Sequence, residues 1–169
     1  MNISMYNASI PVMIKMLGNL ETILDKAIAH AAARKIEDAA FVDARLFPDM
    51  FTFARQIRIA TDMSKGAGAR LAGIDIPKFE DNEKTLPELK ARLRKAIDFL
   101  KTLTPAQIDG SEDKDITLTA GKNTFNFKGL DYLNSWVLPN FYFHVTTAYN
   151  LLRHGGVEIG KMDFLGKVQ

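Results

Sequence analysis

The chain has 169 residues, of which 47% are hydrophobic and 25% are charged, and its formal net charge is +2. This balance predicts one globular domain over residues 1–169 and excludes an intrinsically disordered chain. The sequence contains no cysteine, which excludes disulfides, thiolate metal sites and cysteine nucleophiles.

The charge pattern and the apolar stretches bear on location and partners. Lysine and arginine are mixed with acidic residues along the chain, so we expect no nucleic-acid partner. Residues 10–14 resemble the core of a signal peptide, but no basic residue precedes them and Lys15 interrupts them. No stretch approaches the roughly 18 apolar residues that a membrane-spanning helix needs. We therefore expect a cytoplasmic protein with no membrane partner.

Two long helices are predicted in the first half of the chain. Apolar residues recur at steps of three and four over residues 10–31, and again over residues 50–71. Pro48 and Asp49 are the expected start of the second helix, because proline suits a first turn and a carboxylate meets the positive end of the helix dipole. Residues 35–46, which lie between the two helices, are expected to hold a short helical turn.

A third helix and a hairpin follow. The apolar stripe continues over residues 86–103, with Thr85 as the expected N-cap. The period then changes to two over residues 116–119 and 124–127, and Gly121 lies between these segments. This pattern predicts a β-hairpin, and we expect the two phenylalanines of its second strand to anchor it.

The fourth helix is predicted over residues 129–153, and Pro139 is expected to kink it or break it into two pieces. The following segment, residues 157–169, is too apolar for a free tail and is expected to pack against the helices. Together these patterns predict an all-α fold. It is an up-and-down four-helix bundle with short connections and a small β-hairpin inserted between helices three and four.

His144 is the most informative single residue for function. It shares the stripe of the fourth helix with Phe141 and Ala148, so we expect it to point inward. Imidazole titrates near neutral pH and is the commonest metal-ligating side chain. The alternative is a buried neutral histidine whose nitrogen is simply satisfied by a hydrogen bond.

Polar and aromatic residues surround His144 in the sequence. Asn140, Tyr142 and Tyr149 on the same helix fit the walls of a small-molecule pocket. The alternatives are that these rings pack against neighbouring helices, or that they form a dimer face together with Trp136. From the second helix, oxygen or nitrogen atoms are available on three residues: Asp49, Gln56 and Asp62.

The spacing of histidines does not favour a metal. Two histidines at i and i+4 of one helix can chelate a divalent ion, but Ala148 occupies the position four after His144. His154 lies ten residues on, about 280° around the helix. We therefore expect no metal cofactor, with His144 as the one plausible ligand if a zinc or nickel ion binds.

Several stretches resemble an uncharacterised domain-of-unknown-function family and, through it, the DinB/YfiT-like superfamily. They are residues 46–51 (LFPDMF), 71–73 (LAG), 138–149 (LPNFYFHVTTAY), 152–157 (LRHGGV) and 159–166 (IGKMDFLG). The resemblance implies a four-helix bundle, metal-dependent or thiol-dependent enzymes among the relatives, and homodimers. The superfamily uses one histidine from helix two and two from helix four, and only His144 matches that pattern.

Two functional hypotheses follow. The first is a non-catalytic module that binds a small molecule or forms a homodimer, and that keeps the scaffold with an incomplete metal site. The second is a metal-dependent or thiol-dependent transferase or hydrolase-type enzyme with its pocket around His144. In the second hypothesis His144 and Asp49 are the catalytic residues, zinc or nickel is the cofactor, and four residues contact the ligand: Asn140, Tyr142, Tyr149 and Gln56.

Overall fold

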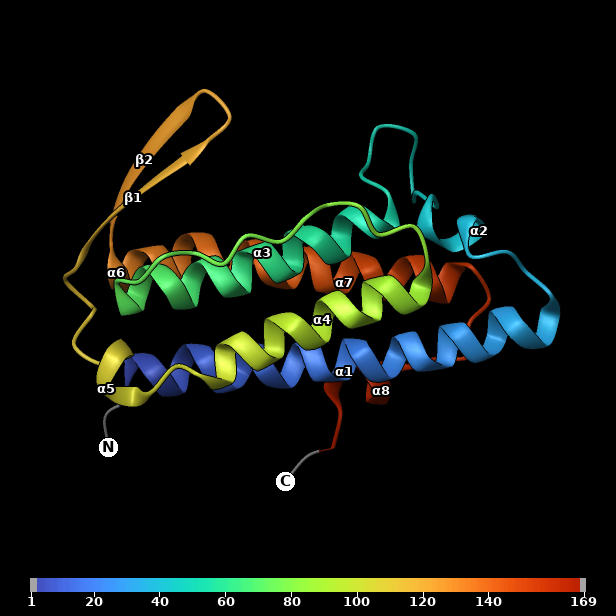
Figure 1. Cartoon of the computed structure of the whole chain (residues 1–169), viewed down its shortest axis with the longest axis horizontal. Coiled ribbons are helices and arrows are strands. Elements are labelled where there is room, and N and C mark those ends of the chain that lie inside the picture. Colours follow the sequence, from blue (N-terminus) through green and yellow to red (C-terminus); the bar gives the residue numbers. More distant parts are fainter. Residues whose placement is uncertain (1–2, 168–169) are drawn as a thin grey trace.

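The computed structural model describes residues 3–167 and is built on four long helices (Figure 1). These are α1 (Met5–Arg34), α3 (Phe53–Ala72), α4 (Leu86–Lys101) and α7 (Leu138–His154). The shorter elements are α2 (Ala39–Val42), α5 (Pro105–Ile108), β1 (Asp115–Ala120), β2 (Asn123–Lys128), α6 (Gly129–Asp131), the π-helical segment η1 (Tyr132–Val137) and α8 (Lys161–Leu165). The predicted four-helix bundle with an inserted hairpin is confirmed. No helix in the described residues is both long and apolar enough to span a membrane.

The predicted apolar stripes meet in one core. Each long helix contributes side chains that are 0% exposed, among them Leu17, Ile57, Leu93 and Phe141. Burying one such side chain contributes about 1.5–3 kcal/mol to folding. The bundle therefore has enough apolar burial to hold the polar groups described below in fixed positions.

The start of α3 differs from the prediction. The helix begins at Phe53, and the side chain of Thr52 accepts a hydrogen bond from the amide of Arg55. Pro48 and Asp49 lie in a turn before the helix, and Asp49 is exposed. The prediction that they open the helix was wrong, because the threonine hydroxyl caps the helix by accepting from one free amide of the first turn. At α4, by contrast, the predicted N-cap Thr85 is confirmed.

α3 and α4 run in the same direction, because residues 73–85, the crossover segment, return along the bundle before α4 begins (Figure 1). The contacts follow this path. Lys65 Nζ donates to the carbonyl of Pro77 at 2.8 Å, and Arg58 Nη2 donates to the carbonyl of Glu83 at 2.7 Å. Later residues of the crossover segment thus lie beside earlier residues of α3. The simple alternation and the short connections expected from the sequence do not hold between these two helices.

The interruption predicted at Pro139 takes the form of a π-helical segment. η1 occupies Tyr132–Val137, and Pro139 lies in the first turn of α7. Proline has no amide hydrogen for the preceding turn, so α-helical hydrogen bonding cannot continue unchanged through it. Asn140 Nδ2 donates to the carbonyl of Trp136 at 2.7 Å, across the junction between η1 and α7.

The hairpin lies against η1 at one end of the bundle (Figure 1). Phe125 and Phe127 contact Trp136, with ring centroids 5.0 and 5.8 Å apart, and Phe127 also contacts Tyr132 at 5.9 Å. The two phenylalanines thus anchor the hairpin as predicted. They also contact Trp136, which stays partly exposed.

The C-terminal segment packs against α1. Val157 and Ile159 are buried, and Asn19 Nδ2 of α1 donates to the carbonyl of Phe164 at 2.9 Å. Lys26 of α1 pairs with Asp163 of α8 at 2.7 Å. The prediction that this apolar segment packs on the bundle is confirmed for its described residues.

Candidate functional site

The side chains of His144 and Gln56 meet inside the bundle. His144 comes from the middle of α7 and is 6% exposed, and Gln56 comes from the first turn of α3 and is 1% exposed. His144 Nδ1 lies 2.6 Å from Gln56 Oε1. The inward position of His144 follows its place on the apolar stripe, and the antiparallel packing of α3 on α7 brings Gln56 to it.

The hydrogen bonds of Gln56 fix the tautomer of the imidazole. Gln56 Nε2 donates to the carbonyl of Phe51 at 3.3 Å, so Oε1 faces His144. An amide oxygen only accepts, and therefore the proton lies on His144 Nδ1. Burial lowers the pKa of His144 below its ordinary value. At neutral pH the ring is uncharged, and its second nitrogen, Nε2, has a free lone pair.

Nε2 is the chemically available atom of this pair. Within residues 3–167 it has no hydrogen-bond partner. His144 keeps 6% of its surface exposed, and Nε2 is not one of the fully buried atoms that lack a partner. A neutral imidazole held through Nδ1 and open at Nε2 can accept one hydrogen bond from a ligand.

Two exposed aromatic residues contact the pair, one through its ring and one through its backbone carbonyl. Phe143 is 56% exposed and makes an edge contact with the His144 ring at 5.2 Å. Phe51, whose carbonyl binds Gln56, is 39% exposed, and the guanidinium carbon of Arg55 lies 3.9 Å from its ring centroid. An exposed ring beside an available acceptor suits contact with an apolar ligand that carries a donor.

The structure does not bring Asp49 into this site. Asp49 is exposed in the turn before α3, and within the described residues it makes no hydrogen bond or ion pair with His144. The carboxylate that a catalytic pair would need is therefore not positioned against the imidazole.

Asn140 is half-buried one turn before His144, and its amide nitrogen is engaged with the carbonyl of Trp136. Tyr142 follows two residues later and lies about 200° around the helix from His144, on the other side. Its ring contacts Phe141 at 5.6 Å, and burial raises its pKa.

Tyr149 faces a different neighbour. Its ring contacts Phe164 of α8 at 5.8 Å, which places it against the C-terminal segment. Of the four residues expected to contact a ligand with His144, Gln56 is the one hydrogen-bonded to it within residues 3–167. The rings of Tyr142 and Tyr149 contact Phe141 and Phe164 instead.

The donor set around His144 does not fit a transition metal. Zinc and nickel sites use three or more nitrogen, oxygen or sulfur ligands. The described residues contain no group of three or more His, Cys, Asp or Glu placed to hold a metal ion. Gln56 offers only a neutral amide, and Ala148, one turn after His144, is fully buried.

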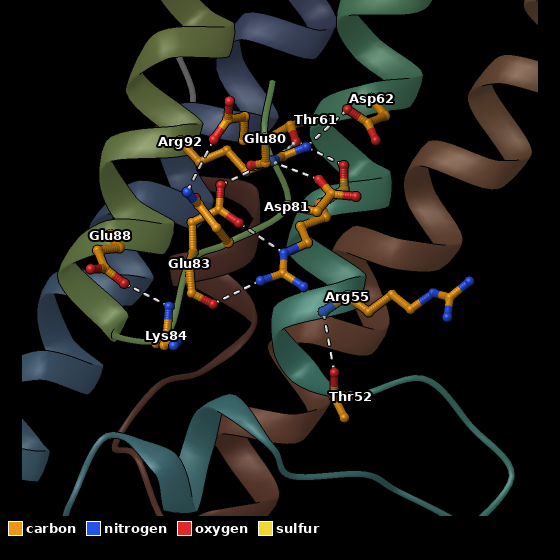
Figure 2. Close-up of polar contacts among 12 residues, drawn as sticks. Thr52, Arg55, Thr61, Asp62, Glu80, Asp81, Glu83, Lys84, Glu88 and Arg92 are labelled. Carbon is orange, nitrogen blue, oxygen red and sulfur yellow. Dashed lines mark hydrogen bonds and ion pairs between the residues drawn. The ribbon is translucent and has the colours of Figure 1, made fainter. Parts of the chain in front are cut away.

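A second polar cluster surrounds Arg92 of α4, whose side chain is 2% exposed (Figure 2). Its Nε donates to Thr61 Oγ1 at 2.8 Å, and its Nη2 pairs with Asp62 Oδ1 at 3.0 Å, both on α3. Its Nη1 faces three acceptors of the crossover segment: Glu83 Oε1 at 2.8 Å, the Glu80 carbonyl at 2.9 Å and Asp81 Oδ1 at 3.0 Å. Arg92 therefore joins α4, α3 and the crossover segment.

Glu83 is the central anion of this cluster. Burial alone would raise its pKa, but hydrogen bonds from Arg92 and Arg58 outweigh burial, and the pKa lies below its ordinary value. Arg58 Nε is 2.8 Å from Glu83 Oε2. The charges of the cluster are thus paired, which indicates that it fastens the crossover segment and so stabilises the parallel arrangement of α3 and α4.

Our reading of the sequence did not identify the Arg92 cluster. The available signal is weak: Arg92 lies three residues after Leu89 and directly before Leu93, at the edge of an apolar stripe. A charged residue at such an edge more often reaches solvent along its aliphatic stem. Its acceptors come from two other segments, and no spacing within one helix points to them.

Comparison with known proteins supports this fold. Residues 5–165 match the model of DUF1993, a domain of unknown function. The crystal structure of a DinB family member from Shewanella denitrificans is similar, with 37% sequence identity and a TM-score of 0.86, over 96% of this chain and 92% of that chain. No curated protein matches the chain. The resemblance stated from the sequence is confirmed, and the chain belongs to the DUF1993 family, whose function is unknown.

Proposed function

We propose that the domain is a non-catalytic module that binds a small molecule at the His144–Gln56 pair. The imidazole supplies one hydrogen-bond acceptor through Nε2, and the exposed rings of Phe143 and Phe51 supply apolar contact. The observation that carries the proposal is the 2.6 Å contact between His144 Nδ1 and Gln56 Oε1, which holds the acceptor in a fixed orientation. Such preorganisation lowers the entropy lost on binding.

The donor set favours this role over the enzymatic alternative. A general base needs an orienting partner that strengthens it, and a carboxylate does so by stabilising the imidazolium. Here the partner is the neutral amide of Gln56, and burial holds the pKa of His144 down. Both features favour a neutral acceptor over a proton-transfer group.

The binding role can be tested with phenol, which joins one hydroxyl donor to an aromatic ring. In ¹⁵N-labelled protein, we expect phenol to shift the His144 Nε2 resonance, and toluene, which lacks the donor, to leave it in place. Phe143→Ala should weaken phenol binding several-fold. Leu130→Ala, which truncates another exposed apolar residue, is the matched control and should bind as the wild type does. If toluene and phenol act alike, the acceptor role is wrong.

Metal analysis tests the rival enzyme. Protein purified without an affinity tag should carry substoichiometric zinc and nickel, and divalent ions should leave its melting temperature unchanged. Gln56→His combined with Ala148→His supplies the superfamily pattern of three imidazoles and should introduce divalent binding. Stoichiometric metal that disappears in His144→Ala would overturn the proposal.

A further inference from the structure

Thr147 lies one turn after His144 on α7 and follows the same edge of the helix. The two residues are spaced at i and i+3, so their side chains are about 60° apart around the helix axis. Side chains at this spacing are neighbours, with Cβ atoms about 5–6 Å apart. Thr147, like His144, is 6% exposed. The α7 side of the candidate site therefore includes a threonine hydroxyl as well as the imidazole.

The hydroxyl of Thr147 points back along α7 toward the level of His144. Thr147 Oγ1 donates to the carbonyl of Phe143 at 2.7 Å, four residues earlier. A carbonyl oxygen only accepts, so the single hydroxyl hydrogen is used in this bond and Oγ1 keeps its lone pairs. The ring of the same Phe143 contacts the His144 ring at 5.2 Å. Phe143 thus borders both polar groups, one through its backbone and one through its ring.

His144 and Thr147 present the same polarity to a ligand. The Nδ1–H of His144 is given to Gln56 and the hydroxyl hydrogen of Thr147 is given to Phe143, so each residue has used its donor inside the chain. The neutral imidazole keeps a lone pair on Nε2, and the hydroxyl keeps lone pairs on Oγ1. Asn140, one turn before His144, retains both an oxygen and one amide hydrogen, and so adds no preference of its own.

Two neighbouring acceptors without a donor select the head group of a ligand. A carboxylate or phosphate would set its own lone pairs against Nε2 and Oγ1, which disfavours an anionic head. A cationic head would lose hydration without a counter-charge, because neither residue contacts a carboxylate within residues 3–167. A neutral head with several N–H donors satisfies both acceptors and leaves no charge unpaired.

We propose that the His144–Gln56 site takes a neutral aromatic molecule whose head group carries at least two N–H donors, as in an arylurea. One N–H binds His144 Nε2, a second binds Thr147 Oγ1, and the aryl ring rests against Phe143. The class of ligand rests on the binding role proposed above and adds to it the head group that the site selects. Thr147 is thus a specificity-determining residue of the site.

Phenylurea is the probe, followed by ¹⁵N NMR of the His144 ring and by ¹H–¹⁵N spectra of the backbone. Its derivative N,N-dimethyl-N′-phenylurea keeps the ring and the carbonyl but only one N–H. We expect phenylurea to shift His144 Nε2 and the Thr147 amide. It should bind about threefold to tenfold more tightly than the dimethyl derivative, which is what one hydrogen bond contributes. Acetophenone and benzoate, which offer only lone pairs, should leave Nε2 in place.

Variants of Thr147 test its part in this selection. Thr147→Val removes the acceptor with little change in volume, so phenylurea and its dimethyl derivative should bind equally well while phenol binds as before. Thr147→Ser restores the hydroxyl and should restore the preference for phenylurea. Thr146→Val is the matched control, since Thr146 is exposed and lies about 200° around the helix from His144. This control variant should keep the wild-type preference.

The outcomes separate the head-group preference from the binding role itself. If phenol shifts His144 Nε2 but phenylurea and its dimethyl derivative bind the wild type equally well, the head-group preference is wrong and the binding role stands. A Thr147→Val variant that keeps the preference would overturn the part assigned to Thr147. If neither phenol nor phenylurea shifts His144 Nε2, the binding role is wrong and the head-group preference is wrong with it.

Discussion

His144 of α7 and Gln56 of α3 lie 88 positions apart in the sequence, and 2.6 Å separates their side-chain atoms inside the bundle. Because Gln56 Nε2 is engaged with the carbonyl of Phe51, its oxygen is the atom that faces the ring. The contact therefore assigns a chemical role to each nitrogen of His144: Nδ1 donates and Nε2 accepts.

The tautomer can be observed directly. In ¹⁵N NMR at pH 7, His144 should show a protonated Nδ1 and an unprotonated Nε2, whose shifts differ widely. Its titration midpoint should fall below the ordinary value of 6.5, because burial disfavours the charged ring. His144→Gln identifies the resonances. A protonated Nε2 at pH 7 would contradict the assignment.

The lowered pKa of His144 also predicts how stability changes with pH. The unfolded chain takes up the proton near pH 6.5 while the folded chain does so at a lower pH, so this contribution is complete above about 6.5 and is lost as the pH falls. Urea unfolding of the wild type and of His144→Gln between pH 7.5 and about 5 checks this. The variant should lose less stability than the wild type over this range.

Removing the acceptor should destabilise the fold. Gln56→Leu leaves the Nδ1–H of His144 buried without a partner, and we expect a loss of about 1–3 kcal/mol in urea unfolding. Gln56→Glu keeps an acceptor and places a carboxylate beside the ring, so the pKa of His144 should rise. A Gln56→Leu variant as stable as the wild type would show that the contact is energetically neutral.

Arg92 should be the most sensitive charged residue of α4. Arg92→Met leaves Glu83 without one of its two arginines in a mostly buried setting, and we expect a loss of about 3–5 kcal/mol. Lys90→Met is the matched control, since Lys90 lies on the same helix and pairs with Asp25 where both side chains are 34% or more exposed. Its loss should stay below about 1 kcal/mol. Similar losses in the two variants would refute a fastening role for Arg92.

Glu83 should make the protein sensitive to acid. Its pKa is lower in the folded chain than its ordinary value of 4.5, so its contribution is complete above that pH and is lost as the pH falls through the folded value. Glu83→Gln should be less stable than the wild type at pH 7, and its melting temperature should fall less between pH 5 and about 3. Parallel melting curves over that range would contradict the prediction.

The helices were readable from the sequence because each buries one apolar face. The three- and four-residue spacing of apolar positions predicts which side chains are buried. One fully buried member from each long helix is Leu17, Ile57, Leu93 or Phe141. The hairpin was readable for the same reason, with a period of two. The start of α3 could not be predicted in this way, because proline and aspartate suit a helix N-terminus as well as a turn. In the structure, the N-cap is Thr52.

Only part of the candidate site could be predicted from the sequence. The stripe placed His144 inside the bundle, but its partner depended on the register between α3 and α7, which no local pattern contains. The sequence offered both Gln56 and Asp49 as partners of His144. Only the structure shows that the Gln56 amide is buried and the Asp49 carboxylate is exposed. The direction of α4 relative to α3 could not be predicted either. The length of a connection does not determine whether the chain reverses direction or runs back along the bundle first.

The crossover segment has a consequence for how the chain reaches its native state. Arg92 meets Thr61 across 31 positions of sequence, so the interface of the parallel helices forms only after the intervening loop has closed. Hairpin-like antiparallel helix pairs close shorter loops and assemble sooner, and a higher contact order slows folding. Interactions made at Arg92 should therefore develop late on the folding pathway, and their loss should act mainly by accelerating unfolding.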